Sequence, residues 1–274
     1  MLAKIPNRAV CLAWALSISV HASAPDITFD CETMPEVCTN MCWAMRCASP
    51  TFPQHLTWDN GSLAWDIMAQ NRAASGCKMA DNRCCAGHKH SKEVGHIGGK
   101  YRTCDEYPFY FTLENGLSNG QAVSRCVRTS SGASQTDLLL DLYEPWVVKG
   151  YRTRKFRVGI ANPGAKGVMY CLNQPCVNDG FELQGGMVKV DGPGGIHGRG
   201  EDPSFRFFKT GSGLVMASVE HMAMGAKFTR RADVGDDLES LRGLDHWVEE
   251  ADGRQTRFVS DVILEEVSPE HFAG

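Results

Sequence analysis

The sequence predicts an α+β fold with a central strand–turn–strand–helix unit between a cysteine-rich N-terminal region and a β-rich C-terminal region. Seven cysteines crowd residues 25–85, strand and helix patterns follow one another through residues 91–161, and short apolar runs separated by glycines fill residues 162–274. We therefore expect four segments: a leader (1–24), a cysteine-rich region (25–90), a mixed core (91–161) and a β-rich acidic region (162–274).

The first 24 residues have the pattern of a secretory signal peptide. Lys4 and Arg8 precede an apolar run over residues 9–20, and small residues follow. An apolar run of about twelve residues is too short to span a bilayer, which needs about twenty. We expect a secreted protein without a membrane segment. Residues 60–62 (Asn-Gly-Ser) form a sequon for N-glycosylation in a eukaryotic secreted protein.

Cysteine usage agrees with secretion. Eleven of the twelve cysteines follow residue 24, and an oxidising route would pair most of them. The spacing of Cys38 and Cys42 predicts a short helix over residues 38–48, and Cys171 and Cys176 are close enough to close a small loop. His88 and His90 follow Cys84-Cys85 and leave zinc open as an alternative, although the spacing favours disulfides.

Charge is distributed unevenly along the chain. Residues 86–170 carry twelve Lys and Arg against seven Asp and Glu, whereas residues 171–274 carry ten against eighteen. A basic segment in an acidic protein indicates a polyanionic partner; the alternative is that the cations merely cover a surface. The densest basic cluster comprises Lys149, Arg152, Arg154, Lys155 and Arg157.

Two acids side by side mark the basic segment. Asp105 and Glu106 stand immediately before a strand predicted over residues 107–113, whose start Pro108 places at a sheet edge. Adjacent carboxylates repel each other unless a cation, a proton or a substrate uses their charge. The alternative is a solvated surface pair.

Further elements follow from local pattern. We expect a turn at residues 114–120, a second strand at 122–129, a break at 130–134, a helix of about ten residues that Pro145 ends, and a strand at 156–161. In the C-terminal region we expect an acidic helix over residues 234–250 among strands at 187–190, 205–208, 213–218 and 257–267.

The predicted helix carries an unusual acid. Asp137 and Asp141 share one face, and like charges four residues apart cost about 0.2–0.5 kcal/mol. Capping and the helix dipole account for Asp137 but not for Asp141, which lies toward the C-terminal end. A bound cation, or an ion pair with an arginine such as Arg125 or Arg128, would remove the penalty.

The stretch from Cys104 to Phe109, with Glu114-Asn-Gly, Arg125-Cys126-Val127 and the helix, resembles the NucA/NucB family of secreted deoxyribonucleases. The resemblance covers about residues 96–161 and implies a small ββα-metal-like nuclease core that cuts DNA. It implies that Asp105 is the base, with Glu106 its acidic neighbour, and that Asp141 supplies a metal ligand from the helix.

Phosphodiester hydrolysis needs a base, a divalent cation and basic residues around the phosphates. We accordingly expect Mg²⁺ or Mn²⁺ bound by Asp141 and Glu106, and phosphates held by Arg102, Arg125 and Arg128. The predicted function is a non-specific endodeoxyribonuclease with DNA as its partner and no stable protein partner. Alternatives are a non-catalytic binding or toxin-like protein that retains the scaffold, and a hydrolase that uses Asp105 and Glu106 on a glycoside.

The two cysteines of the predicted hairpin form the last expectation. Cys104 precedes its first strand and Cys126 lies within its second, so cross-strand pairing predicts a disulfide between them. Closing this loop of about twenty residues would contribute roughly 3 kcal/mol.

Overall fold

The computed structural model describes residues 24–78, 84, 101–185, 187–188, 203–232, 245–249 and 255–272. The chain forms, in order, β1 (Ile27–Asp30), α1 (Pro35–Arg46), β2 (His55–Asp59), η1 (Asn60–Leu63), α2 (Trp65–Ala74), β3 (Tyr101–Tyr107), α3 (Leu113–Leu117), β4 (Val123–Arg128), α4 (Thr129–Val148), β5 (Thr153–Ala161), β6 (Leu183–Gln184), β7 (Met187–Val188), β8 (Arg206–Thr210), β9 (Val215–Ser218), β10 (Lys227–Arg231), β11 (Asp245–Glu249), β12 (Gln255–Val267) and η2 (Pro269–Phe272).

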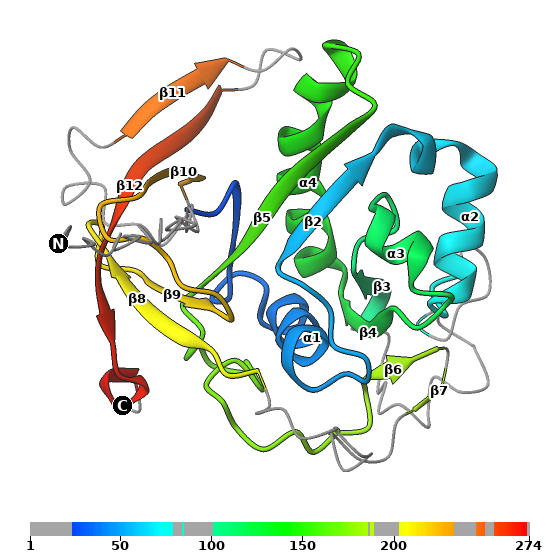
Figure 1. Ribbon diagram of the computed structural model, residues 1–274, viewed down its shortest axis with the longest axis horizontal. Helices are drawn as coiled ribbons and strands as arrows, with labels where there is room; N and C mark the ends of the chain where they lie inside the picture. Colours follow the sequence, from blue (N-terminus) through cyan, green and yellow to red (C-terminus); the bar gives the residue numbers. More distant parts are fainter. Residues whose placement is uncertain are drawn as a thin grey trace, which may run out of the picture.

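The strands make two sheets (Figure 1). The larger has eight strands in the order β1-β5-β9-β8-β12-β10, with β2 also paired to β5 and β11 to β12. The smaller has four strands in the order β3-β4-β6-β7. Within the described ranges, the strand pairs are antiparallel except β1 with β5. The α+β class predicted from the sequence is confirmed.

The β3–β4 hairpin is the frame of the central region. Helices α1 and α4 both contact it, and α4 follows β4 without a connecting loop. The end of α2 lies against the same hairpin, because the Ser124 hydroxyl on β4 donates to the Ser75 carbonyl at 2.7 Å. Hairpin, α4 and the end of α2 thus meet around one short stretch of β3.

The first helix is fixed by its cysteines. Pro35 starts α1, and Cys42 and Cys47 are bonded to Cys171 and Cys176. The predicted helix near residues 38–48 is confirmed, but the expected small loop between Cys171 and Cys176 is not formed: each sulfur reaches α1 across 129 residues instead. Cys31 and Cys38 close the start of the helix.

The predicted Cys104–Cys126 disulfide is wrong. The two residues do stand opposite each other in the hairpin. However, Cys104 is bonded to Cys77 and Cys126 to Cys84, both from the segment that follows α2. The four cysteines share one buried cluster, in which cross-strand proximity alone does not decide the partner. These two bonds tie that segment to the hairpin.

Several predicted element boundaries are corrected around the motif. The first strand ends, rather than begins, at Tyr107, and the aromatic run after Pro108 turns inward so that Phe109 and Phe111 are buried. Residues 114–117 lie in α3, which the Thr112 hydroxyl caps by accepting from the Asn115 amide. The second strand, β4, is where we predicted it.

The helix after β4 is twice the predicted length. It has 20 residues and includes the serines expected to break it, because the Ser131 hydroxyl donates to Glu36 of α1 at 2.9 Å. It also continues past Pro145 for a final turn, where Trp146 packs on Trp58 and Phe156.

The C-terminal region is β-rich, as predicted. Strand β12 pairs with β10 and β11 in its first half and with β8 in its second, across an irregularity between Ile263 and Glu265. Strand β10 was not foreseen. The predicted helix over residues 234–250 is wrong at its end, because Asp245–Glu249 pairs with β12 as a strand; its remainder lies outside the described residues.

Other expectations fall outside the described residues: the leader up to residue 23, the His88 and His90 alternative, and the side chain of Arg102. In the part of the chain that is described, no helix combines the length and apolar character needed to cross a membrane.

Candidate active site

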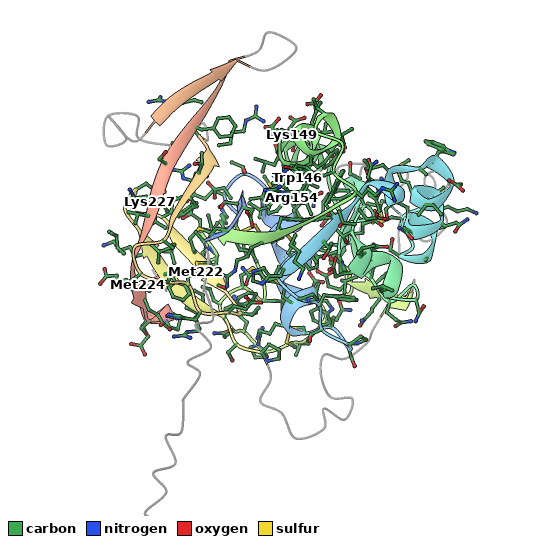
Figure 2. All side chains as sticks on the ribbon, turned by 45° about the horizontal axis from the view of Figure 1, so that its top comes forward. Trp146, Lys149, Arg154, Met222, Met224 and Lys227 are labelled. Carbon is green, nitrogen blue, oxygen red and sulfur yellow. A yellow bond between two sulfur atoms is a disulfide. The ribbon has the colours of Figure 1, made fainter. Side chains whose placement is uncertain are left out.

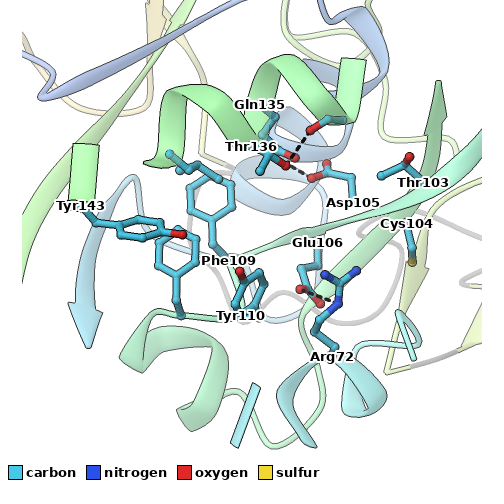
Figure 3. Close-up of a pocket in the computed structure, with 13 residues that line it drawn as sticks. Arg72, Thr103, Cys104, Asp105, Glu106, Phe109, Tyr110, Gln135, Thr136 and Tyr143 are labelled. Atoms are coloured by element: carbon cyan, nitrogen blue, oxygen red, sulfur yellow. Dashed lines mark hydrogen bonds and ion pairs between the residues drawn. The ribbon is translucent and has the colours of Figure 1, made fainter. Parts of the chain in front are cut away.

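A pocket of about 80 Å³ opens where β3 passes between α4 and the end of α2 (Figure 3). One side is polar and the other is aromatic. Its walls are Arg72, Thr103, Cys104, Asp105, Glu106, Phe109, Tyr110, Phe111, Gly132, Gln135, Thr136, Leu139 and Tyr143. The acid pair therefore lies in a pocket. It is near the C-terminal end of β3, whereas the sequence predicted it just before the start of a strand.

Asp105 is buried and held by two amides. The Asn40 side chain on α1 donates to Oδ2 at 2.8 Å, and the Gln135 side chain on α4 donates to Oδ1 at 2.6 Å. The carboxyl is 3% exposed, so these two donors replace most of its water. Both come from helices on the same side of the hairpin, which fixes the carboxyl between them.

Glu106 faces α2, on the other side of β3 from the α1 and α4 donors of Asp105, but both carboxyls line the same pocket. The Ser75 hydroxyl, just after α2, donates to Oε2. Arg72 on α2 is 3.8 Å from Oε1 (Figure 3). Arg72 also lies over the ring of Tyr110, with its guanidinium carbon 5.4 Å from the ring centre. One carboxyl is thus held by neutral amides and its neighbour by a cation.

Burial dominates the electrostatics of this pair. It raises the pKa of Asp105 from 3.8 to about 7, against the opposing effect of the Asn40 and Gln135 hydrogen bonds. The charge of Glu106 raises the same pKa further. Burial also raises the pKa of Glu106 from 4.5 to about 7, although Arg72 and Ser75 favour its charged form. Both carboxyls therefore exchange protons near neutral pH.

Aromatic side chains form the other wall. Phe109 and Phe111 stack with their ring centres 5.6 Å apart, and Tyr143 of α4 packs on Phe111 at 5.1 Å. Tyr110 and Tyr143 share a hydrogen bond, and burial raises the pKa of both. These rings keep water away from one side of the carboxyl pair.

In a comparison with protein families, the family described as Deoxyribonuclease NucA/NucB matches residues 41–155. The match covers 115 of the 274 residues and supports the NucA/NucB nuclease family for this region. The matched region includes both carboxyls, the second half of α1, the hairpin and the whole of α4. Searches of the curated proteins and of the solved structures found no match to the chain.

The NucA/NucB region starts fifty residues before the point at which we expected the core to begin. Its N-terminal part supplies Arg72 and Ser75, and Asn40 lies one residue before it. Sequence reasoning missed these three residues and Gln135. Only Gln135 left a signal, as an amide six residues into the helix that follows the hairpin. Asn40, Arg72 and Ser75 reach the pocket through tertiary packing alone.

The predicted phosphate-binding arginines have carboxylate partners in the structure. Arg125 is 2.7 Å from Glu182 and 2.7 Å from Asp179. Burial alone would lower the pKa of Arg125, but the charge of Glu182 and the hydrogen bonds with Asp179 raise it. Arg128 is 2.6 Å from Glu36. The described arginine that lines the pocket is Arg72 instead.

Asp141 does not reach the NucA/NucB pocket. Its carboxylate lies 3.1 Å from Arg231 on β10, and it lines a second pocket of about 220 Å³ beside β1, β10 and β12. Asp141 therefore pairs with an arginine, which is one of the two interpretations of the sequence. The arginine is Arg231, ninety residues away, rather than Arg125 or Arg128. The helix residue that faces Asp105 is Gln135.

The described residues hold no group of three or more His, Cys, Asp or Glu side chains that would make a ready metal site. Around the pocket, Asp105 and Glu106 offer carboxylate oxygens and Gln135 an amide oxygen, the donors that Mg²⁺ prefers. Mg²⁺ usually takes one or two carboxylates and keeps several waters. Two adjacent buried carboxyls with raised pKa values would also gain from a cation, so these residues fit one.

Proposed function

We propose that the protein is a secreted, divalent-metal-dependent, non-specific endodeoxyribonuclease with a ββα-metal-like core formed by β3, β4 and α4. The observation that carries the proposal is the buried Asp105–Glu106 pair in the pocket of a NucA/NucB region. Five disulfides among the described residues support the secreted location, since such bonds persist in oxidising compartments.

Asp105 is suited to act as the general base. A base works best when its pKa lies near the operating pH, and burial brings the pKa of Asp105 to about 7. Asn40 and Gln135 hold both oxygens, so the carboxylate has one orientation when it takes a proton from water. A divalent cation held by Asp105, Glu106 and the Gln135 carbonyl oxygen would supply positive charge for the phosphoryl group.

Arg72 is suited to hold the phosphate. Its side chain is 23% exposed and borders the pocket, and the Tyr110 ring supports one face of its guanidinium. A guanidinium carries five donors, so an interaction with Glu106 leaves others for phosphate oxygens. Glu106 in this role positions Arg72.

A specific observation favours an alternative, a non-catalytic protein that retains the scaffold. Gln135 presents its amide N–H to Asp105, and Asp141 lies in another pocket. An amide donor at this position would suit a carboxylate locked in a structural network as well as a catalytic base.

Plasmid cleavage separates the two. We expect purified wild type to nick and linearise supercoiled plasmid with Mg²⁺ or Mn²⁺, to stop on addition of EDTA, and to lose activity in Asp105→Asn. Folded wild type that leaves plasmid intact with either cation, from pH 6 to pH 9, would support the non-catalytic protein.

A further inference from the structure

A basic and aromatic surface lies at the far end of α4 from the pocket. We name it the α4–β5 patch, and it consists of Trp146, Lys149, Tyr151, Arg152 and Arg154, with a fourth cation, Lys155, beside it on the other face of β5. Figure 2 shows Trp146, Lys149 and Arg154 grouped at this end of the helix. The four cations are exposed, Tyr151 is 40% exposed, and Trp146 is half-buried against the core. The patch is therefore open to a partner.

Arg154 is held within the patch by two rings. Its guanidinium carbon is 5.6 Å from the centre of Trp146 and 5.0 Å from that of Tyr151. Tyr151 is placed by its own amide, which donates to the Trp146 carbonyl at 3.0 Å. A guanidinium that stacks on aromatic rings still has the N–H donors along its edge free to bind another group. These donors lie in one plane and can form two parallel hydrogen bonds to a phosphate.

The positive charge of the patch is not neutralised by the described part of the chain. The ion pairs among described residues involve none of Lys149, Arg152, Arg154 and Lys155. Arg157, which belongs to the same cluster in the sequence, differs: it is buried and 3.0 Å from Glu220. The structure thus separates four cations available to a partner from one that is structural.

The core-facing side of α4 runs from the pocket to the patch and therefore gives the distance between them. Gln135, Leu139 and Tyr143 line the pocket at four-residue steps, and Trp146 follows three residues on. Trp58 packs on both Tyr143 and Trp146, with ring centres 6.4 Å and 5.7 Å away. Eleven residues of helix rise by about 16 Å. One strand of a DNA duplex advances by about 3.4 Å per nucleotide, so this length corresponds to about five nucleotides.

We propose that the α4–β5 patch is a docking surface for the DNA backbone, which binds phosphates about five nucleotides from the bond that lies in the pocket. This inference rests on the proposed nuclease function, because it takes DNA as the ligand. Contacts to phosphates carry no sequence information, which agrees with non-specific cleavage.

The test compares two triple variants with equal charge change. The patch variant is Lys149→Ala/Arg152→Ala/Arg154→Ala, which leaves the rings of Trp146 and Tyr151 in place. The control is Lys166→Ala/Lys209→Ala/Lys227→Ala, which removes three exposed lysines outside the patch; Figure 2 shows Lys227 well away from it. The proteins are made without N-glycans. The backbone N–H of Asn60 donates a hydrogen bond to the Arg152 carbonyl, so a glycan on Asn60 would lie beside the patch.

Binding of a fluorescent 20-base-pair duplex is measured in EDTA between 50 and 200 mM salt. Each phosphate contact contributes about 0.9 to the slope of log affinity against log salt, so the patch variant should have a slope smaller by about 2.7. We expect its affinity at 50 mM salt to fall by at least about tenfold, and that of the control to change much less.

Equal slopes and affinities in the two variants would overturn the docking surface, even if wild type cleaves plasmid. Conversely, a patch-dependent affinity in a wild type that does not cleave would retain the docking surface and reject the nuclease. Cleavage gives a second readout: the patch variant should raise KM for long duplex and leave hydrolysis of bis(p-nitrophenyl) phosphate, which reaches only the pocket, unchanged. Loss of both activities together would count against docking.

Discussion

At the scale of single residues, the site depends on a carboxyl that is buried beside another carboxyl. Asp105 accepts hydrogen bonds from two neutral amides and contacts no cation among the described residues, whereas Glu106 lies beside Arg72. Neutral donors hold the group in place without abolishing its affinity for a proton. The raised pKa of Asp105 is therefore a consequence of which side chains surround it, and it can be tested.

Asp105→Asn should abolish cleavage and leave the protein folded. Loss of a general base costs about 10²–10⁴ in rate. The new amide would face two amide donors, but Asn40 can turn to accept from it, because its Oδ1 is buried and has no hydrogen-bond partner among the described residues. Plasmid cleavage and circular dichroism measure the two effects. Retention of more than about a tenth of the rate would contradict the base assignment.

The pH dependence follows from the same pKa. Activity should fall as pH falls through about 7, where Asp105 becomes protonated. Stability should change in the opposite direction: the folded pKa lies above the unfolded value of 3.8, so this contribution is complete below about pH 4 and is lost as pH rises to about 7. A pH–rate profile and melting temperatures of wild type and Asp105→Asn test both. An identical pH dependence of melting in the two proteins would contradict the shift.

Cation binding distinguishes the two acidic candidates. Mg²⁺ or Mn²⁺ should raise the melting temperature of wild type, as any ligand specific for the folded state must. We expect Glu106→Gln to lose most of that rise and Asp141→Ala to keep it, because Asp141 lies beside Arg231 outside the pocket. Thermal melts with and without cation measure this. A rise lost only in Asp141→Ala would restore the helix aspartate as a ligand.

At the scale of elements, the approach of α4 to β3 places Gln135 against Asp105. Gly132 makes this contact possible: an added Cβ would lie 2.6 Å from the Thr103 Cγ2 and 3.1 Å from its Cβ. Since Gln135 is less than one turn further along, any displacement of the first turn of α4 also moves its amide away from the carboxyl.

Gly132→Ala should therefore lower both stability and activity. Overpacking of this kind costs about 1–3 kcal/mol. Gly116→Ala is the control, because the nearest atom to its added Cβ is 4.0 Å away, and a helical Gly→Ala change there should be neutral or stabilising. The double variant Gly132→Ala/Thr103→Ser removes the clashing methyl and should recover part of the loss. Melting temperatures and cleavage rates of the three variants test this prediction. If the double variant recovers neither stability nor activity, a contact other than the one with the Thr103 methyl causes the loss.

At the scale of the whole molecule, disulfides join segments that are far apart in the chain. Cys42–Cys171 spans 129 residues, whereas Cys31–Cys38 spans 7. The loop-entropy model gives about 5 kcal/mol for the long loop and about 2 kcal/mol for the short one. Because Cys47–Cys176 closes the same long loop, both bonds must be removed to open it, and we expect Cys42→Ala/Cys47→Ala/Cys171→Ala/Cys176→Ala to lower the melting temperature at least twice as much as Cys31→Ala/Cys38→Ala. Equal losses would show that packing around α1, rather than the closed loop, sets the stability.

The chain by itself determined the features that depend on neighbouring residues. The acid pair, the hairpin strand β4, the helix after it and the helix carrying Cys38 and Cys42 all follow from patterns within a few turns or strands. The family resemblance likewise rests on one short stretch around Asp105. Such features are readable because alternation, helical spacing and turn residues report local conformation directly.

Only the tertiary structure decided which distant groups meet. Asn40, Ser75 and Gln135 surround the acid pair, Arg231 faces Asp141, and Cys104 is bonded to Cys77 rather than to the cysteine opposite it. Periodicity shows which face of an element is buried, but not which partner covers it, because the partner depends on packing between elements many residues apart. The acid pair was therefore visible in the sequence, whereas the surroundings that raise its pKa were not.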